Sequence, residues 1–305
     1  MPAACEPFFL PVDAAKPGQR FCIFHPAKGD TVRGAILYIH PFAEEMNKSR
    51  RMVALQSRAL ADAGFAVLQI DLLGCGDSSG DFGDASWQDW VDDVVRGTEW
   101  LLARYRPDGG ESRIAPPLWL WGLRTGCLLA AEASRHLPTP CNFLLWAPAP
   151  AGKLQLQQFL RLKAAGDMLG GGAKGVTDGL RQQLAAGTAI EVAGYTIAPG
   201  LAHGMEKSVL EPPASGLKGT GASPGPVVEW FELSTRDDTS LSPVARKTVD
   251  TWRQHGFAVR SHIVNGPAFW QTTEIEDAPA LLDATLQALW GQVLPFAPKG
   301  AKGRT

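Results

Sequence analysis

One stretch constrains the fold of this chain more than any other: residues 119–134, WLWGLRTGCLLAAEAS. An apolar run leads into a short turn with a glycine at each end, and a second apolar run of helical character follows. A sharp turn from strand to helix holds the residue at its apex in a strained backbone conformation, which requires small residues two positions away on either side. Gly122 and Gly126 meet that requirement around Arg124. The stretch therefore predicts a strand, an elbow and a helix, and the alternative is an ordinary glycine-flanked turn.

Apolar runs and amphipathic stretches alternate along most of the chain. We expect an opening hairpin at 7–26, strands at 34–42, 65–71, 141–149, 226–234 and 257–266, and helices at 47–64, 86–105, 243–256 and 277–293. Such alternation produces right-handed strand–helix–strand units. The predicted fold class is α/β, with a mostly parallel, doubly wound sheet of about eight strands and helices on both faces.

Residues 150–225 break this alternation. They contain two helical pieces separated by the glycine-rich run 170–175, which reads either as a hinge or as a disordered loop. Because the segment is inserted between two strands of the sheet, we expect a cap or lid over the carboxyl ends of the strands. The expected core is then 1–149 with 226–293, and 294–305 form a flexible tail.

The composition excludes several classes of protein. With 305 residues, of which 45% are hydrophobic, the chain can bury a large core. A net charge of −2 gives no general attraction to nucleic acid or to anionic membranes. The five cysteines include no C-x-x-C pair, so we expect neither disulfides nor a zinc site, and no cofactor. No signal peptide and no apolar run of roughly 20 residues is present, which predicts a cytoplasmic protein without a membrane span.

Three motifs carry a resemblance to a known fold. The turn GLRTG at 122–126 resembles the G-x-S-x-G nucleophile elbow of the α/β-hydrolase fold, with Arg124 in the place of the serine. The stretch DLLGCGDSSG from Asp71 resembles the D-x-x-G-x-G-x-S-x-G loop of that fold, and His40-Pro41-Phe42 stands where its oxyanion loop begins. These motifs occur in the family's order, and the match covers roughly 30–290.

A narrower resemblance rests on four segments: HPFAEEMNKSRRM, DLLGCGDSSGDF, GLRTG and GPAFWQTTEI. Together they are similar to the type 2 hydrolases associated with the bacterial exosortase A system. The resemblance implies a hydrolase of the carboxylic-ester type, with proteins of the exosortase and exopolysaccharide machinery as partners.

The triad that such chemistry needs is not visible. Arginine, with a pKa above about 12, cannot act as the nucleophile. Asp237 and Asp238 follow the penultimate strand and offer the acid, although they also read as solvated turn residues. The loop after the last strand contains no histidine, and we expect His255 and His262 to be structural. Conventional serine hydrolysis is therefore not expected.

Two thiols lie near the motifs. We expect the side chain of Cys127 to face the interface between sheet and helix, where a cysteine behaves as a small hydrophobe. Cys75 is predicted to be more exposed, and the neighbouring charge of Asp77 raises the pKa of its thiol. Neither thiol has an identified base.

Charged residues gather in HPFAEEMNKSRR, the stretch predicted to lead into the helix at 47–64. His40, Glu44, Glu45, Arg50 and Arg51 are predicted to lie near Arg124. A charge at the floor of a covered cleft costs several kcal/mol unless it is paired. We therefore expect the guanidinium to bond Glu44, Glu45, the pair Asp237/Asp238, or an anion on a ligand. On a loop, such charges also read as a solvated face.

Three functions follow from these residues. The first is a protein of hydrolase fold that lacks the triad and binds a small anionic or acyl ligand in the cleft between cap and core. The second is an unusual hydrolase in which His40, Glu44 or Glu45 activates water, and the third is a scaffold that binds a protein partner. The catalytic candidates are His40, Glu44, Glu45, Arg124, Asp237 and Asp238. The ligand-binding candidates are Phe42, Arg50, Arg51, Cys75, Asp77 and Trp270.

Overall fold

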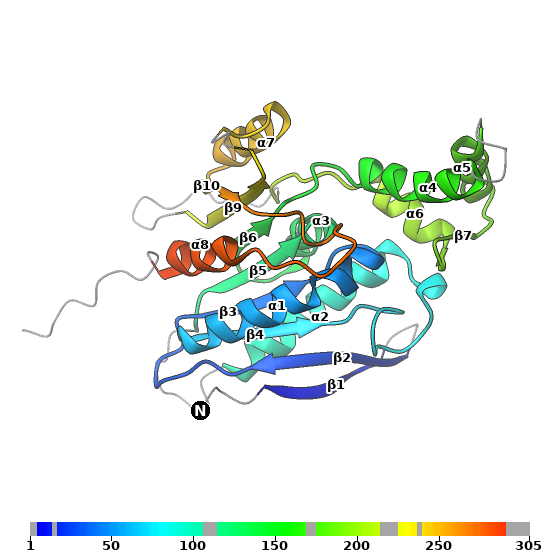
Figure 1. Cartoon of the computed structure of the whole chain (residues 1–305). Coiled ribbons are helices and arrows are strands. Elements are labelled where there is room, and N and C mark those ends of the chain that lie inside the picture. The colour runs from blue at the N-terminus through cyan, green and yellow to red at the C-terminus, as the bar shows by residue number, and fades with distance from the viewer. Residues whose placement is uncertain are drawn as a thin grey trace, which may run out of the picture.

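An eight-stranded sheet forms the centre of the molecule (Figure 1). The computed structural model describes residues 5–13, 17–105, 115–168, 175–213, 225–236 and 240–290. The strand order is β1-β2-β4-β3-β5-β6-β9-β10, and all neighbours from β4 to β10 are parallel, whereas β2 runs antiparallel to both β1 and β4. The strands are β1 Glu6–Val12, β2 Gly18–His25, β3 Gly34–Ile39, β4 Phe65–Ile70, β5 Leu118–Leu123, β6 Asn142–Trp146, β9 Val227–Ser234 and β10 Ala258–Asn265.

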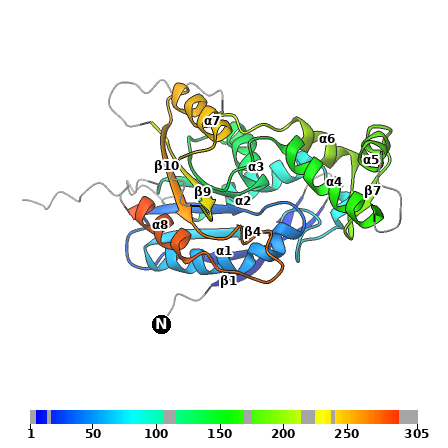
Figure 2. The same ribbon diagram turned by 45° about the horizontal axis from the view of Figure 1, so that its top comes forward.

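Helices cover both faces of this sheet, as Figures 1 and 2 show. One face carries α1 (Glu44–Asp62) and α8 (Pro279–Trp290), and the other carries α2 (Trp87–Arg104), α3 (Thr125–Ala133) and α7 (Pro243–Gln254). Two apolar clusters follow from this arrangement, one on each face of the sheet. The central strands are buried on both sides, which explains why β3 and β5 are apolar at every position.

The segment between β6 and β9 forms a separate group of elements at one end of the sheet (Figure 1). We call it the inserted segment. It contains α4 (Gly152–Met168), α5 (Val176–Ala185), the short hairpin β7 (Ile190–Val192) and β8 (Tyr195–Ile197), and α6 (Pro199–Lys207). Helix α6 packs on α2, where Gly204 lies against the side chain of Trp87. The expected tail at 294–305 and most of the glycine-rich run at 170–175 lie outside the described residues.

The predicted elements are present, with one change that matters for the site. Helix α1 was expected from residue 47 but begins at Glu44, so Glu44 and Glu45 lie on its first turn and not on a loop. Carboxylates are stabilised at that position because the amino end of a helix carries a partial positive charge. In the described part of the chain, no helix is long and apolar enough to cross a membrane.

Candidate functional site

The predicted elbow is present, and Arg124 lies at its apex between β5 and α3. Its backbone has φ 55° and ψ −115°, a conformation that L-residues rarely adopt. Both flanking glycines are needed for steric reasons. A Cβ on Gly122 would lie 2.5 Å from the Cys127 nitrogen, and one on Gly126 would collide with the carbonyl oxygen of Ile39. The strand–turn–helix prediction is therefore confirmed, and the backbone at the apex is strained.

A second elbow of the same shape begins α1. Ala43 precedes that helix with φ 51° and ψ −129°, close to the values at Arg124. Because β3 and β5 are neighbours in the sheet, the helices that follow them begin at the same edge. Neither helix has a side-chain cap at its first turn. The two amino ends therefore present backbone N–H groups without helical partners, an arrangement that favours negative charge.

The guanidinium of Arg124 contacts three elements. Its Nε lies 3.5 Å from Oε1 of Glu45 on α1, within ion-pair range but without the geometry of a hydrogen bond. Its Nη2 donates to Oε1 of Gln155 on α4, at 2.9 Å. The centre of the guanidinium lies 5.4 Å from the ring centroid of Trp270, within the range of a cation–π interaction. Among the carboxylates considered as partners, Glu45 lies within reach, whereas Asp237 and Asp238 lie outside the described residues.

Glu45 is a buried carboxylate whose two oxygens differ in their contacts. Its Oε1 also accepts from Gln271 at 3.5 Å, while Oε2 is buried without a partner among the described residues. Burial raises the pKa of this carboxyl, and the charge of Arg124 opposes that shift. Glu44 is different, because its Oε2 accepts from the Tyr195 hydroxyl at 2.9 Å and from Asn47 at 3.1 Å. Glu44 thus connects α1 to the inserted segment.

Arg50 and Arg51 of α1 do not join this group, contrary to the sequence prediction. Arg50 pairs with Asp71 at 3.1 Å. Arg51 donates through Nε and Nη2 to both carboxylate oxygens of Asp277, ahead of α8, at 2.8–3.2 Å. The reason is the helical geometry: residues five and six positions along α1 point away from the side that Glu45 presents to Arg124.

His40 is a buried residue whose two ring nitrogens both have partners. Its Nδ1 lies 2.8 Å from the carbonyl oxygen of Pro41, and its Nε2 accepts from the backbone N–H of Leu72 at 3.3 Å. This pattern fits a neutral ring with the proton on Nδ1. Burial lowers the pKa of the imidazole, which keeps it neutral. The contacts fasten the end of β3 to the loop after β4.

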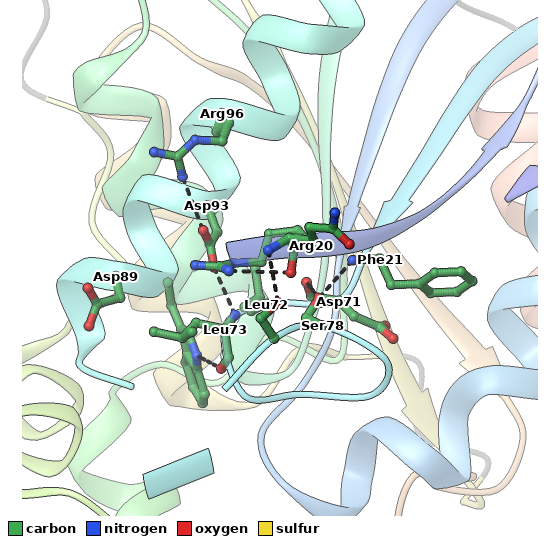
Figure 3. Close-up of polar contacts among 12 residues, drawn as sticks. Arg20, Phe21, Asp71, Leu72, Leu73, Ser78, Asp89, Asp93 and Arg96 are labelled. Atoms are coloured by element: carbon green, nitrogen blue, oxygen red, sulfur yellow. Dashed lines mark hydrogen bonds and ion pairs between the residues drawn. The ribbon is translucent and has the colours of Figure 1, made fainter. Parts of the chain in front are cut away.

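The loop after β4 is held by polar contacts within the molecule (Figure 3). Asp93 on α2 accepts from Arg20 Nε at 2.7 Å, from the Leu73 N–H at 2.8 Å and from Arg96 at 3.2 Å. The Ser78 hydroxyl bonds the carbonyl oxygen of Asp71 and accepts from the Phe21 N–H. These bonds join the loop to β2 and α2.

The same loop corrects the expectation for Cys75. Its side chain is buried, with 4% exposed, because the loop folds it against the apolar cluster that α2 covers. Burial and the charge of Asp71 raise the pKa of the thiol far above its ordinary value. Asp77 is exposed, and its backbone N–H donates to Asp71. Cys127 is buried as expected, with Sγ 3.7 Å from the carbonyl oxygen of Trp146.

The loop after β10 approaches the elbow with an aromatic ring. Trp270 covers the guanidinium of Arg124, and its indole Nε1 is buried without a partner among the described residues. His262 lies within β10, where its Nε2 is 2.7 Å from Oε2 of the buried Glu229. Its ring stacks on Phe231, on the next strand. This is the structural role expected for His262.

A cleft of about 370 Å³ lies beside these residues, between α1, α4 and the loop after β10. Its walls are mainly apolar: Phe42, Phe159, Leu162 and the ring of Trp270. The polar groups at the cleft are the side chains of Glu44, Glu45, Lys48, Gln155, Gln158 and Gln271. The rings of Phe42 and Phe159 meet edge to face at 5.0 Å, which joins the core to the inserted segment. The volume is within the range of small-molecule sites.

The sequence prediction missed the contribution of α4 to this site. Gln155, Gln158, Phe159 and Leu162 all come from that helix. The stretch QLQQFLRL, from 155 to 162, places polar and apolar residues three and four positions apart, a spacing that indicates one helical face with mixed character. In the described residues, no group of three or more His, Cys, Asp or Glu side chains is arranged to hold a metal ion.

Comparison with known proteins agrees with the fold. A family model described as serine aminopeptidase, S33, matches residues 30–175. No curated protein matches the chain. Est1E from Butyrivibrio proteoclasticus, solved with bound ferulic acid, superposes with a TM-score of 0.61 at 13% identity, over 90% of this chain and 96% of that one.

Two further solved structures are similar. A putative hydrolase from Agrobacterium vitis S4 has a TM-score of 0.56 at 15% identity and covers 94% of this chain and 98% of its own. A soluble variant of monoglyceride lipase from Saccharomyces cerevisiae, in complex with a substrate analogue, has a TM-score of 0.56 at 14% identity, over 93% and 94%. The chain has the α/β-hydrolase fold. The family model matches part of the chain, and the solved structures show the fold.

Proposed function

We propose that this protein retains the hydrolase fold but not serine hydrolysis, and that it binds an acyl ligand in the cleft beside Arg124. Arg124 stands where the fold places its nucleophile, and Trp270 approaches it from the loop that carries the catalytic histidine in such enzymes. A guanidinium cannot attack a carbonyl and an indole cannot accept a proton. This pairing of Arg124 with Trp270 is the observation that carries the proposal.

The cleft supports an acyl ligand because its walls are aromatic and aliphatic. We propose that the inserted segment acts as the cap of the cleft. Two contacts of α4 with the core support this: Gln155 accepts a hydrogen bond from Arg124, and the ring of Phe159 packs on the ring of Phe42. Burial of an alkyl chain here would stabilise the complex by about 25 cal/mol per Å² of apolar surface removed from water.

Substitution of Arg124 by serine tests the loss of the triad. Arg124→Ser rebuilds the G-x-S-x-G pattern, yet we expect no hydrolysis of short or long p-nitrophenyl esters above the wild-type background. The reason is that His40 has both ring nitrogens bonded and His262 faces Glu229, so neither of these histidines can take the proton of the new hydroxyl. A fluorophosphonate probe should label neither protein. Rapid ester turnover by the variant would contradict the proposal.

A second candidate function rests on Glu45. Its Oε2 has no partner in the described residues, and its pKa is raised, as a general base requires. In this scheme Glu45 takes a proton from water while the water oxygen attacks the acyl carbon. The N–H groups of the two helix ends would stabilise the negative oxygen, and the proton would pass to the departing alkoxide. Turnover by the wild type that is lost in Glu45→Gln would favour this function.

We also propose that the protein belongs with the exosortase and exopolysaccharide machinery and acts in the cytoplasm. The support is the set of four segments that resemble the type 2 hydrolases of that system. Deletion of the gene should reduce polysaccharide export or surface sorting, and a plasmid-borne copy should restore it. An unchanged surface would contradict the association and leave the ligand proposal standing.

A further inference from the structure

A second hollow, of about 300 Å³, adjoins the cleft on the other side of Gln155. It is lined by Arg124, Leu154, Gln155, Gln157, Gln158 and Arg161. Gln155 and Gln158 line both spaces, so one stretch of α4 forms a wall of the cleft and a wall of the hollow. The two spaces are therefore neighbours along the same helix.

The charges of the two spaces differ. The lining of the hollow includes two arginines and no carboxylate, whereas the cleft is lined by two carboxylates, Glu44 and Glu45, and by one cation, Lys48. Arg161 is exposed, and no carboxylate of the described residues pairs with it. Among the described residues, Glu45 is the carboxylate that pairs with Arg124, at 3.5 Å, and α3 begins directly after Arg124 with its partial positive end. The hollow is thus the positive part of the site.

We infer that Arg124 and Arg161 bind the anionic head of a single-chain acyl ligand whose chain lies in the cleft. This inference rests on the proposed function and adds the class of head group and its place. The orientation follows from charge, because a carboxylate or phosphate in the cleft would lie beside Glu44 and Glu45. In the hollow it meets two guanidinium groups, which bind planar or tetrahedral oxyanions through paired N–H donors. Gln155 positions Arg124 for this role.

Isothermal titration calorimetry with matched ten-carbon ligands tests the inference. The ligands are decyl phosphate, decanoate and decan-1-ol, each below its micelle concentration, with inorganic phosphate as the chain-free arm. We expect both anions to bind at least tenfold more tightly than the alcohol, and phosphate alone to bind weakly. Affinity for the anions, but not for the alcohol, should fall as sodium chloride is raised.

The variant Arg161→Gln isolates the second guanidinium. Because the residue is exposed on α4, the fold should be unaffected. Anion affinity should fall about tenfold and alcohol affinity should not change. Arg58→Gln, an exposed arginine on α1 outside both spaces, is the matched control and should bind all ligands as the wild type does.

The outcomes separate the two proposals. If none of the chain-bearing ligands binds, the proposed function is wrong. If they bind with equal affinity whatever their charge, or if Arg161→Gln behaves as Arg58→Gln does, the acyl cleft stands and the anion site is overturned. If decyl phosphate binds tightly and decanoate as weakly as the alcohol, the head group is a phosphate.

Discussion

At the scale of single residues, the elbow holds Arg124 in a strained backbone conformation between β5 and α3. Residues in such conformations cost roughly 1–3 kcal/mol each and persist only where the surroundings determine them fully. At Arg124 the surroundings are two glycines packed against backbone atoms. At Ala43 they are the fixed end of β3 and the first turn of α1. Here the elbow directs the Arg124 side chain to the hollow beside the cleft, within ion-pair range of Glu45.

Gly126→Ala should destabilise the protein by about 1–3 kcal/mol, the usual cost of forcing extra atoms into a packed site. Helix propensity alone would favour alanine at this position in α3, so a loss can only reflect the collision with Ile39. Gly179→Ala on α5 is the control, because a Cβ there meets nothing within 4 Å. Gly179→Ala should stabilise the protein by about 0.5–1 kcal/mol. Urea unfolding of both variants measures the difference, and equal effects would contradict the steric account.

At the scale of elements, the loop after β4 is held to β2 and α2 mainly by Asp93 and its two arginines. Asp93→Asn removes the negative charge and leaves Arg20 buried without a counter-ion. Such a change typically costs 3–5 kcal/mol. The matched control is Asp62→Asn, which breaks the exposed pair with Lys28 and should cost about 0–1 kcal/mol. Similar losses in the free energy of unfolding for both variants would show that the buried pair has no special role.

His25, on β2 where it pairs with β4, makes the stability of the fold depend on pH. His25 is buried, accepts from Gln69 at 3.0 Å, and has its pKa lowered to about 4 by burial and by Arg58. The unfolded chain binds a proton near pH 6.5 and the folded chain only near pH 4, so the stabilisation is complete above pH 6.5 and is lost as the pH falls toward 4. Burial also lowers the pKa of His40, so this residue too makes the folded protein less stable as the pH falls.

His25→Gln should therefore weaken the loss of stability between pH 6.5 and 4, because glutamine accepts the bond from Gln69 without titrating. Urea unfolding at several pH values in this interval checks the difference in slope. An identical slope in wild type and variant would exclude His25 as a source of the pH dependence.

The elements were largely predictable from the sequence, whereas the site was predictable only in part. Apolar runs identified the buried strands, and Ser86 marked the start of α2, where it accepts from the Asp89 N–H. The first turn of α1 was missed because Glu44 and Glu45 read as loop charges. Partners in space could not be read from spacing: Arg51 reaches Asp277, and Gln155 reaches Arg124, across long separations in the chain. The burial of Cys75 likewise depends on how the whole loop folds.

At the scale of the whole molecule, polar contacts fasten the inserted segment to the core. One is the Tyr195 hydroxyl, which donates to Glu44 on α1. Tyr195→Phe removes that bond, worth about 0.5–1.5 kcal/mol. Backbone amides between 175 and 213 should then exchange roughly two- to tenfold faster, while amides in the central strands keep their protection. Hydrogen exchange read by mass spectrometry measures both regions.

Tyr105→Phe at the end of α2 is the control for this change, since that residue lies outside the inserted segment. It should leave exchange between 175 and 213 unaltered. Faster exchange spread evenly over sheet and insertion in Tyr195→Phe would mean that the two parts open together and not separately.

The position of β1 at the edge of the sheet has a consequence for self-association. An unpaired edge offers its backbone to any other extended chain, and proteins that leave one open risk aggregation. In β1, Pro7 and Pro11 alternate with Phe9 along one row of the strand. Proline has no N–H and is tolerated in a sheet where that row faces outward. The outward row of β1 thus lacks two of its donors, and a second copy of the chain cannot continue the sheet there by regular pairing. We therefore expect this edge to resist the addition of further strands.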